Sequence, residues 1–73
     1  MQPQENLLRR DAVVKKTGLS QAELYRQVAD GEFPKPVKIA TRAVAWVESE
    51  VDAWIAERVA VRDVEVNGKA VAA

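Results

Sequence analysis

Side chains that can pair with bases and phosphates occur in two stretches of this sequence. In the first, the Gln21 amide can bond an adenine edge, and the Arg26 guanidinium can bond a guanine or a phosphate. The Tyr25 hydroxyl between them can bond a phosphate while the ring packs on the protein. The alternatives are solvated positions for Gln21 and Arg26, and a core position for Tyr25.

The second stretch is basic and alternates with apolar residues. It contains Lys35, Lys38 and Arg42, with Thr41 beside the last. An arginine at a hairpin tip can enter a narrow minor groove, where the negative potential is enhanced, and lysines can neutralise phosphates. Solvation at the surface is the alternative for both lysines. Four further basic residues can add to the same face, namely Arg9, Arg10, Lys15 and Lys16.

The net charge of zero hides an uneven distribution. Residues 1–46 carry eight basic and five acidic side chains, a surplus of +3, whereas residues 47–73 carry three basic and six acidic ones, a surplus of −3. This distribution suggests that the basic part of the chain forms the binding face and that the acidic part supports it. The alternative is ordinary solvated surface charge.

The composition excludes several kinds of chemistry. A chain of 73 residues forms one small domain that buries only about 60% of its unfolded surface, which leaves little room for an enclosed catalytic pocket. The sequence has no cysteine and no histidine, so it offers no disulfide, no thiolate nucleophile and none of the usual zinc ligands. It shows no paired-carboxylate motif and no phosphate-cradling glycine loop. We therefore expect no enzyme, no cofactor and no metal site.

The sequence also lacks segments that direct a protein to a membrane. No apolar run approaches the roughly 18 residues of a membrane span, and the N-terminus has no signal-peptide pattern. We expect a cytoplasmic protein.

Two short helices are expected to position the first stretch. A helix over 11–17 is favoured by Asp11 at its start, and Gly18 suits the position after its end. Ser20 then predicts the N-cap of a second helix over 20–30, and Glu23 stands where a capping box needs it. The turn of about three residues between them is typical of a helix-turn-helix, or of an ordinary helical corner.

A β-hairpin is expected to carry the second stretch. Pro34 and Pro36 disfavour a helix and favour an extended lead. Period-two runs on either side of residues 40–42 predict a hairpin over 36–46. Near the N-terminus, Leu7 and Leu8 begin a short strand or a lead-in to the core.

A third helix is expected to complete one domain over residues 7–61. Ser49 predicts its N-cap, and an apolar stripe follows at helical spacing through Val51, Trp54, Ile55 and Val59. Residues 1–6 are expected to form a flexible leader. We expect residues 62–73 to form a disordered tail, with a hairpin at Asn67–Gly68 as the alternative.

The order helix, turn, helix, hairpin, helix is that of a winged helix-turn-helix, mainly α with a small β-hairpin. The sequence also resembles the AlpA family of phage and prophage regulators, which is similar to excisionases and to the DNA-binding part of MerR-type proteins. The resemblance covers about residues 7–60. The matching pieces are Thr17-Gly18-Leu19-Ser20, Leu24-Tyr25-Arg26, Gly31, Phe33-Pro34, Pro36-Val37, Arg42-Ala43-Val44, Trp46, Glu50-Val51 and Trp54-Ile55.

The resemblance implies a sequence-specific DNA-binding protein that regulates transcription at the nucleoid. Helix 20–30 is expected to read the major groove, and the wing, residues 36–46, to touch the minor groove or the backbone. The implied partners are double-stranded DNA and, beyond it, neighbouring copies, an integrase or RNA polymerase. The implied contact residues are Ser20, Gln21, Ala22, Tyr25, Arg26, Lys35, Lys38, Thr41 and Arg42.

The sequence departs from the family pattern at two positions. Glu23 stands where members often have Thr or Ser, and Ala40 where they often have Gly. Glu23 would repel phosphates, although it can accept a bond from a cytosine amino group, and a capping role is the other interpretation. Two other functions stay open: an excisionase-type factor that bends DNA, or an adaptor or antitoxin-like module that binds protein and not DNA.

Overall fold

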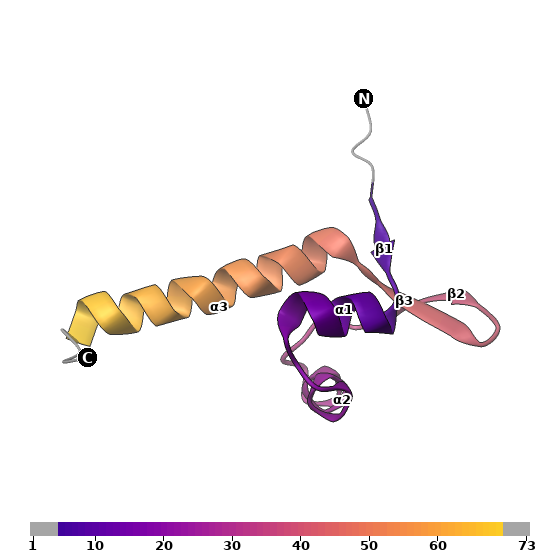
Figure 1. Ribbon diagram of the computed structural model, residues 1–73, viewed down its shortest axis with the longest axis horizontal. Helices are drawn as coiled ribbons and strands as arrows, with labels where there is room; N and C mark the ends of the chain where they lie inside the picture. The colour runs from indigo at the N-terminus through magenta and orange to yellow at the C-terminus, as the bar shows by residue number, and fades with distance from the viewer. Residues whose placement is uncertain (1–4, 70–73) are drawn as a thin grey trace.

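The computed structural model describes the backbone of residues 5–69 and the side chains of residues 5–65. Three helices pack beside a small antiparallel sheet, a layout compatible with a winged helix-turn-helix, and the third helix extends well beyond the rest (Figure 1). No helix within residues 5–69 is long and apolar enough to cross a membrane. The elements are β1 (Leu7–Leu8), α1 (Arg10–Thr17), α2 (Gln21–Ala29), β2 (Val37–Ala40), β3 (Ala43–Val47) and α3 (Glu48–Lys69).

Local hydrogen bonds fix the corner between α1 and α2 as the sequence predicted. Gly18 adopts a left-handed conformation with φ 80°, which costs glycine little, and its N–H donates to the Val14 carbonyl at 2.8 Å. The Ser20 hydroxyl accepts from the backbone N–H of Glu23 at 3.1 Å, so Ser20 caps α2. The predicted turn between two short helices is confirmed.

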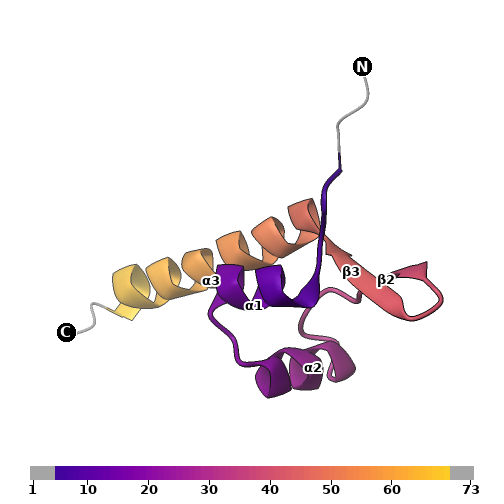
Figure 2. The same ribbon diagram turned by 45° about the vertical axis from the view of Figure 1, so that its right-hand side comes forward.

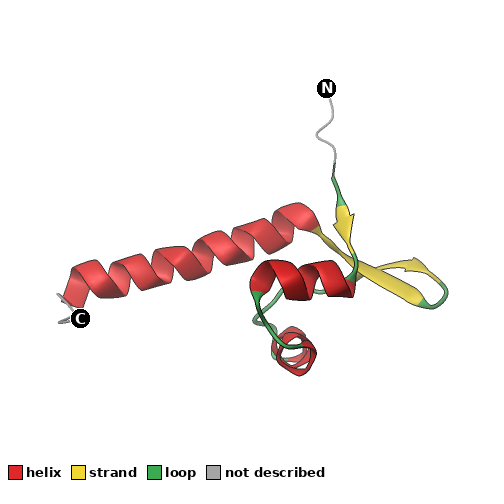
Figure 3. Cartoon of the chain, viewed as in Figure 1, coloured by secondary structure: helices red, strands yellow, loops and turns green. Residues whose placement is uncertain are grey.

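The sheet has the strand order β1–β3–β2, with both neighbours antiparallel to β3. Figure 3 shows β2 and β3 as the predicted hairpin, with β1 on the other side of β3. Leu8 pairs with Trp46, which confirms the strand that Leu7 and Leu8 suggested. Lys38 pairs with Val44 and Ala40 with Ala43, so Ile39 is an extra residue in a β-bulge.

The core lies where α1, α2 and the start of α3 meet β3. Trp46 is fully buried, and its indole N–H donates to the Pro34 carbonyl at 2.8 Å, so the large side chain is buried without an unpaired polar atom. The other buried members of this cluster are Val13, Leu24, Phe33 and Val51.

The start of α3 differs from the prediction. The helix begins at Glu48, directly after β3, and Ser49 is inside it rather than at its N-cap. The Ser49 hydroxyl donates to the Glu5 carboxylate at 3.0 Å, while the N–H of Glu48 donates to the Asn6 carbonyl at 2.8 Å. A distant segment therefore binds the first turn and satisfies the Glu48 N–H, and two residues of the expected leader are held against it. Residues 1–4 lie outside the described residues.

The end of α3 also differs from the prediction. The helix continues to Lys69, so the part of the expected tail that the structure describes is helical, and the Asn67–Gly68 turn signal lies within it. No proline interrupts residues 62–69, and Arg62, Glu65 and Lys69 are good helix formers. Residues 70–73 lie outside the described residues.

Candidate nucleic-acid interface

One side of α2 is exposed. Leu24 is fully buried and Val28 is half-buried, so the core lies on their side of the helix. Arg26 falls on the opposite side at 100° per residue. Figures 1 and 2 both show α1 between α2 and α3, so α2 forms an edge of the molecule. The exposed residues of this edge that were predicted as contacts are Ser20, Gln21, Ala22, Tyr25 and Arg26.

Arg26 is held by one carboxylate on α2 and one at its C-cap. Its guanidinium pairs with Glu23 and, at 3.4 Å, with Asp30. The Arg26 guanidinium, with a smaller contribution from the Gln27 amide, lowers the pKa of Glu23. The backbone N–H of Glu23 takes part in the helix cap, as one interpretation of this residue expected. Its carboxylate does not take part in the cap and instead orients and neutralises Arg26.

A basic groove joins α2 to the wing. It is a hollow of about 230 Å³ that includes Tyr25 of α2, Arg42 of the β2–β3 turn and Val44 of β3. Tyr25 is 40% exposed, and its ring centroid lies 6.3 Å from that of Trp46. The structure therefore brings together Tyr25 and Arg42, which lie far apart in the sequence. The remaining residues that line this groove are Arg9, Arg10 and Asp11.

Arg9 and Arg10 enter this groove because they precede and begin α1. The Tyr25 side chain and, less strongly, Asp11 raise the pKa of Arg10, so the guanidinium stays charged. Asp11 is the one acidic residue that lines the groove among the described residues, and its carboxylate lies 3.6 Å from Arg10. The sequence predicted Arg9 and Arg10 only as additional charge on this face, and a basic pair just before a helix was the pattern that indicated them.

The other predicted contacts divide between this face and a different one. Lys38 is exposed opposite Val44, and directly opposed residues point to the same face of a sheet, so Lys38 lies on the side of the groove. Thr41 is exposed in the turn beside Arg42. Lys35 instead lines a separate hollow next to α3. Lys16 pairs with Glu48 and Asp52, both at 2.9 Å, and so links α1 to α3.

Comparison with known proteins identifies the family of this chain. The family described as "Prophage CP4-57 regulatory protein (AlpA)" matches residues 6–59. The chain is 44% identical over 59 residues to "Uncharacterized protein ORF88" of Enterobacteria phage P4, covering 81% of this chain and 67% of that protein. It is 34% identical over 58 residues to "DNA-binding transcriptional activator AlpA" of Escherichia coli K12, covering 71% of this chain and 83% of that protein. The chain belongs to the AlpA family of prophage regulatory proteins.

Proposed function

We propose that this protein is a cytoplasmic, sequence-specific DNA-binding regulator of transcription that acts on the nucleoid. The observation that carries this proposal is the groove in which Tyr25 of α2 and Arg42 of the wing share one basic surface. The relative from Escherichia coli is described as a DNA-binding transcriptional activator, which supports the same function here.

The exposed face of α2 suits the major groove, which admits one helix and displays a distinct pattern for each base pair. Gln21 and Arg26 reach for base edges, with Ser20 and Ala22 close to the DNA in the first turn. On binding DNA, Arg26 gives up part of its ion pair with Glu23 and forms hydrogen bonds with a guanine or a phosphate.

The wing touches the adjacent minor groove or backbone. Arg42 at the turn enters the minor groove, and Thr41 and Lys38 bond phosphates. Arg9 and Arg10 add charge to the same contact, and the Tyr25 hydroxyl bonds a phosphate between helix and wing. Lys35 contributes through long-range attraction, since it lines a different hollow.

One module of this size covers roughly 600–1,000 Å² of its own surface on DNA, which limits affinity. Tight binding then draws on neighbouring copies, an integrase or RNA polymerase as additional partners.

Fluorescence anisotropy tests the proposal with labelled duplexes that tile the DNA around the protein's own coding sequence. With four to six phosphates neutralised, the logarithm of the affinity should fall against the logarithm of salt concentration with a slope of about −4 to −5. Arg42→Ala should make the slope shallower by about 1, whereas Arg62→Ala on α3 should leave it unchanged. Absence of salt-sensitive binding to every duplex would contradict DNA binding.

A further inference from the structure

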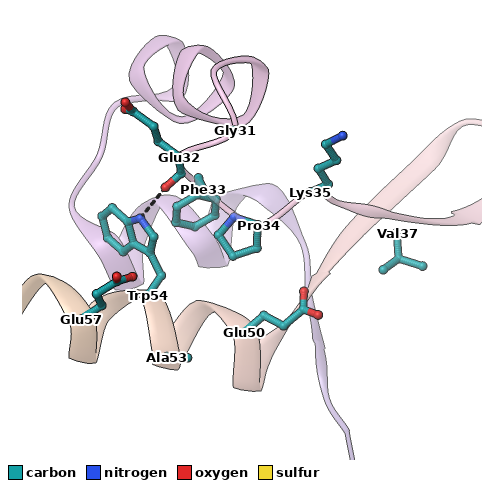
Figure 4. A pocket seen from close by; sticks show the side chains of 10 residues that line it. All are labelled: Gly31, Glu32, Phe33, Pro34, Lys35, Val37, Glu50, Ala53, Trp54 and Glu57. Atoms are coloured by element: carbon teal, nitrogen blue, oxygen red, sulfur yellow. Dashed lines mark hydrogen bonds between the residues drawn. The ribbon is translucent and has the colours of Figure 1, made fainter.

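A second hollow lies away from the basic groove, between the segment after α2 and the first turns of α3. Its volume is about 620 Å³, and Figure 4 shows Phe33, Pro34 and Trp54 at its base, with Val37 toward the wing. We call this hollow the flank groove. Its lining combines apolar side chains with four charged ones, so it offers a surface for a chain segment that carries both kinds of side chain.

Trp54 is held in a fixed position at this groove. Its indole N–H donates to the Glu32 carbonyl at 2.9 Å, and its ring meets that of Phe33 edge to face with centroids 4.9 Å apart. Phe33 is only 3% exposed, so it anchors the contact to the core. Trp54 also borders a neighbouring hollow of about 400 Å³, so a ligand can approach this ring from either hollow.

Three carboxylates surround this aromatic base, those of Glu32, Glu50 and Glu57. Among the described residues, none of these side chains takes part in an ion pair or a side-chain hydrogen bond, unlike those of Glu23 and Glu48. Lys35 is the one basic residue that lines the groove within the described part of the chain. With three carboxylates and one basic side chain among its described lining residues, the groove carries net negative charge, and Arg58 lines the neighbouring hollow.

We propose that the flank groove binds an extended, arginine-bearing segment of a partner protein. A guanidinium stacked on Trp54 gains cation–π attraction and reaches the carboxylates of Glu32 and Glu57 at once. Apolar neighbours in the segment pack on Pro34 and Val37. A nucleic acid is disfavoured here because its phosphates would meet three carboxylates.

The flank groove shares only Lys35 with the predicted DNA contacts, so both surfaces can be occupied together. The protein then connects a polyanion on one side with a basic protein segment on the other. Binding at the flank groove is measurable without DNA, so this inference and the proposed function fail independently.

The test is an NMR titration with the capped peptide Gly-Arg-Leu-Arg-Leu-Arg-Gly, and with the same peptide in which citrulline replaces arginine. The readout is the indole N–H signal of Trp54, assigned with Trp54→Phe. We expect a saturable shift of Trp54 with the arginine peptide, while Trp46 stays unchanged. Citrulline keeps the shape and removes the charge, so the second peptide should bind about tenfold more weakly.

Charge variants distinguish the effect of the carboxylates in the flank groove from the effect of the protein's overall charge. Glu32→Gln, Glu50→Gln and Glu57→Gln together should weaken the arginine peptide about tenfold. The matched control, Asp11→Asn, Asp63→Asn and Glu65→Gln, changes the net charge equally outside the groove and should retain binding. Amide signals and thermal unfolding report whether each variant is folded.

Several outcomes overturn the proposal: no saturable shift at Trp54, equal binding of both peptides, or equal losses in both triple variants. Sedimentation of the protein alone provides a further check. A dimer that dissociates in the groove variant but not in the control variant would identify a second copy as the occupant, and would likewise overturn the proposal.

Discussion

The Tyr25 ring of α2 packs against the Trp46 indole of β3, with 6.3 Å between the ring centroids and 53° between the planes. Trp46 is fully buried, and its N–H is bonded to the Pro34 carbonyl, so it is fixed within the core. Tyr25 therefore links the exposed helix to the strand that carries the wing. The positions of α2 and the wing relative to each other depend in part on this contact.

Two substitutions at Tyr25 should separate its ring from its hydroxyl. Tyr25→Phe keeps the packing on Trp46, so thermal unfolding should be nearly unchanged, while duplex affinity should fall about fivefold through loss of one phosphate bond. Tyr25→Ala should lower both the melting temperature and the affinity. Circular dichroism and anisotropy measure the two effects. Equal destabilisation by both substitutions would show that the ring contact is unimportant.

Truncation of Leu24 should destabilise the domain strongly. Its side chain is fully buried between the helices and the sheet, and Leu→Ala in a core costs about 2–5 kcal/mol. Leu24→Ala should therefore unfold at much lower urea concentration. Ala22→Ser, on the exposed side of the same helix, serves as the control and should change stability by less than about 0.5 kcal/mol. A small effect at Leu24 would contradict the assigned core.

Release of Arg26 should strengthen general DNA binding. Glu23 neutralises the guanidinium in the free protein, so Glu23→Gln should raise duplex affinity several-fold and steepen the salt dependence by up to about 1. Asp63→Asn is the matched control, because Asp63 pairs with Arg62 on α3 at 2.8 Å. Unchanged DNA binding by Glu23→Gln, measured by anisotropy, would show that Glu23 does not oppose binding, and weaker binding would show that Glu23 serves DNA contact.

The link between α1 and α3 should make stability fall in acid. Lys16, and to a smaller extent Asn6, lowers the pKa of Glu48 below its usual 4.5. The resulting stabilisation is present above pH 4.5 and is lost as pH falls through the lowered pKa of the folded state. Lys16→Met should be slightly less stable at neutral pH and should lose less stability on acidification. The free energy of unfolding of the natural sequence and of Lys16→Met, measured with urea at several pH values, tests this link. Parallel pH profiles for the two proteins would contradict it.

Local patterns predicted the parts of the fold that neighbouring residues determine. The Ser20 cap and the Gly18 turn depend on residues within one helical turn, and the alternation around residues 40–42 is a property of each strand. The start of α3 was not predictable in this way. Its partners, Glu5 and Asn6, lie more than forty residues away in the chain, so only the folded structure reveals them.

The candidate site was predictable in its residue types but not in its grouping. Lys35 and Lys38 look alike in the sequence, yet Lys35 lines the flank groove and Lys38 lies on the side of the wing that Val44 occupies. Lys35 precedes β2, between Pro34 and Pro36, whereas Lys38 lies within the strand. Similarly, Glu23 has the spacing of a capping box, but its carboxylate pairs with Arg26 instead of bonding the start of the helix.

The most direct test of the DNA-binding surface is chemical-shift mapping of the labelled protein with the duplex that binds best in the anisotropy series. We predict that the largest changes in backbone amide signals fall in residues 20–29 and 38–43, with the Arg9 and Arg10 amides also shifted. Largest changes along α3, or small changes spread evenly over the chain, would contradict a DNA contact made by α2 and the wing.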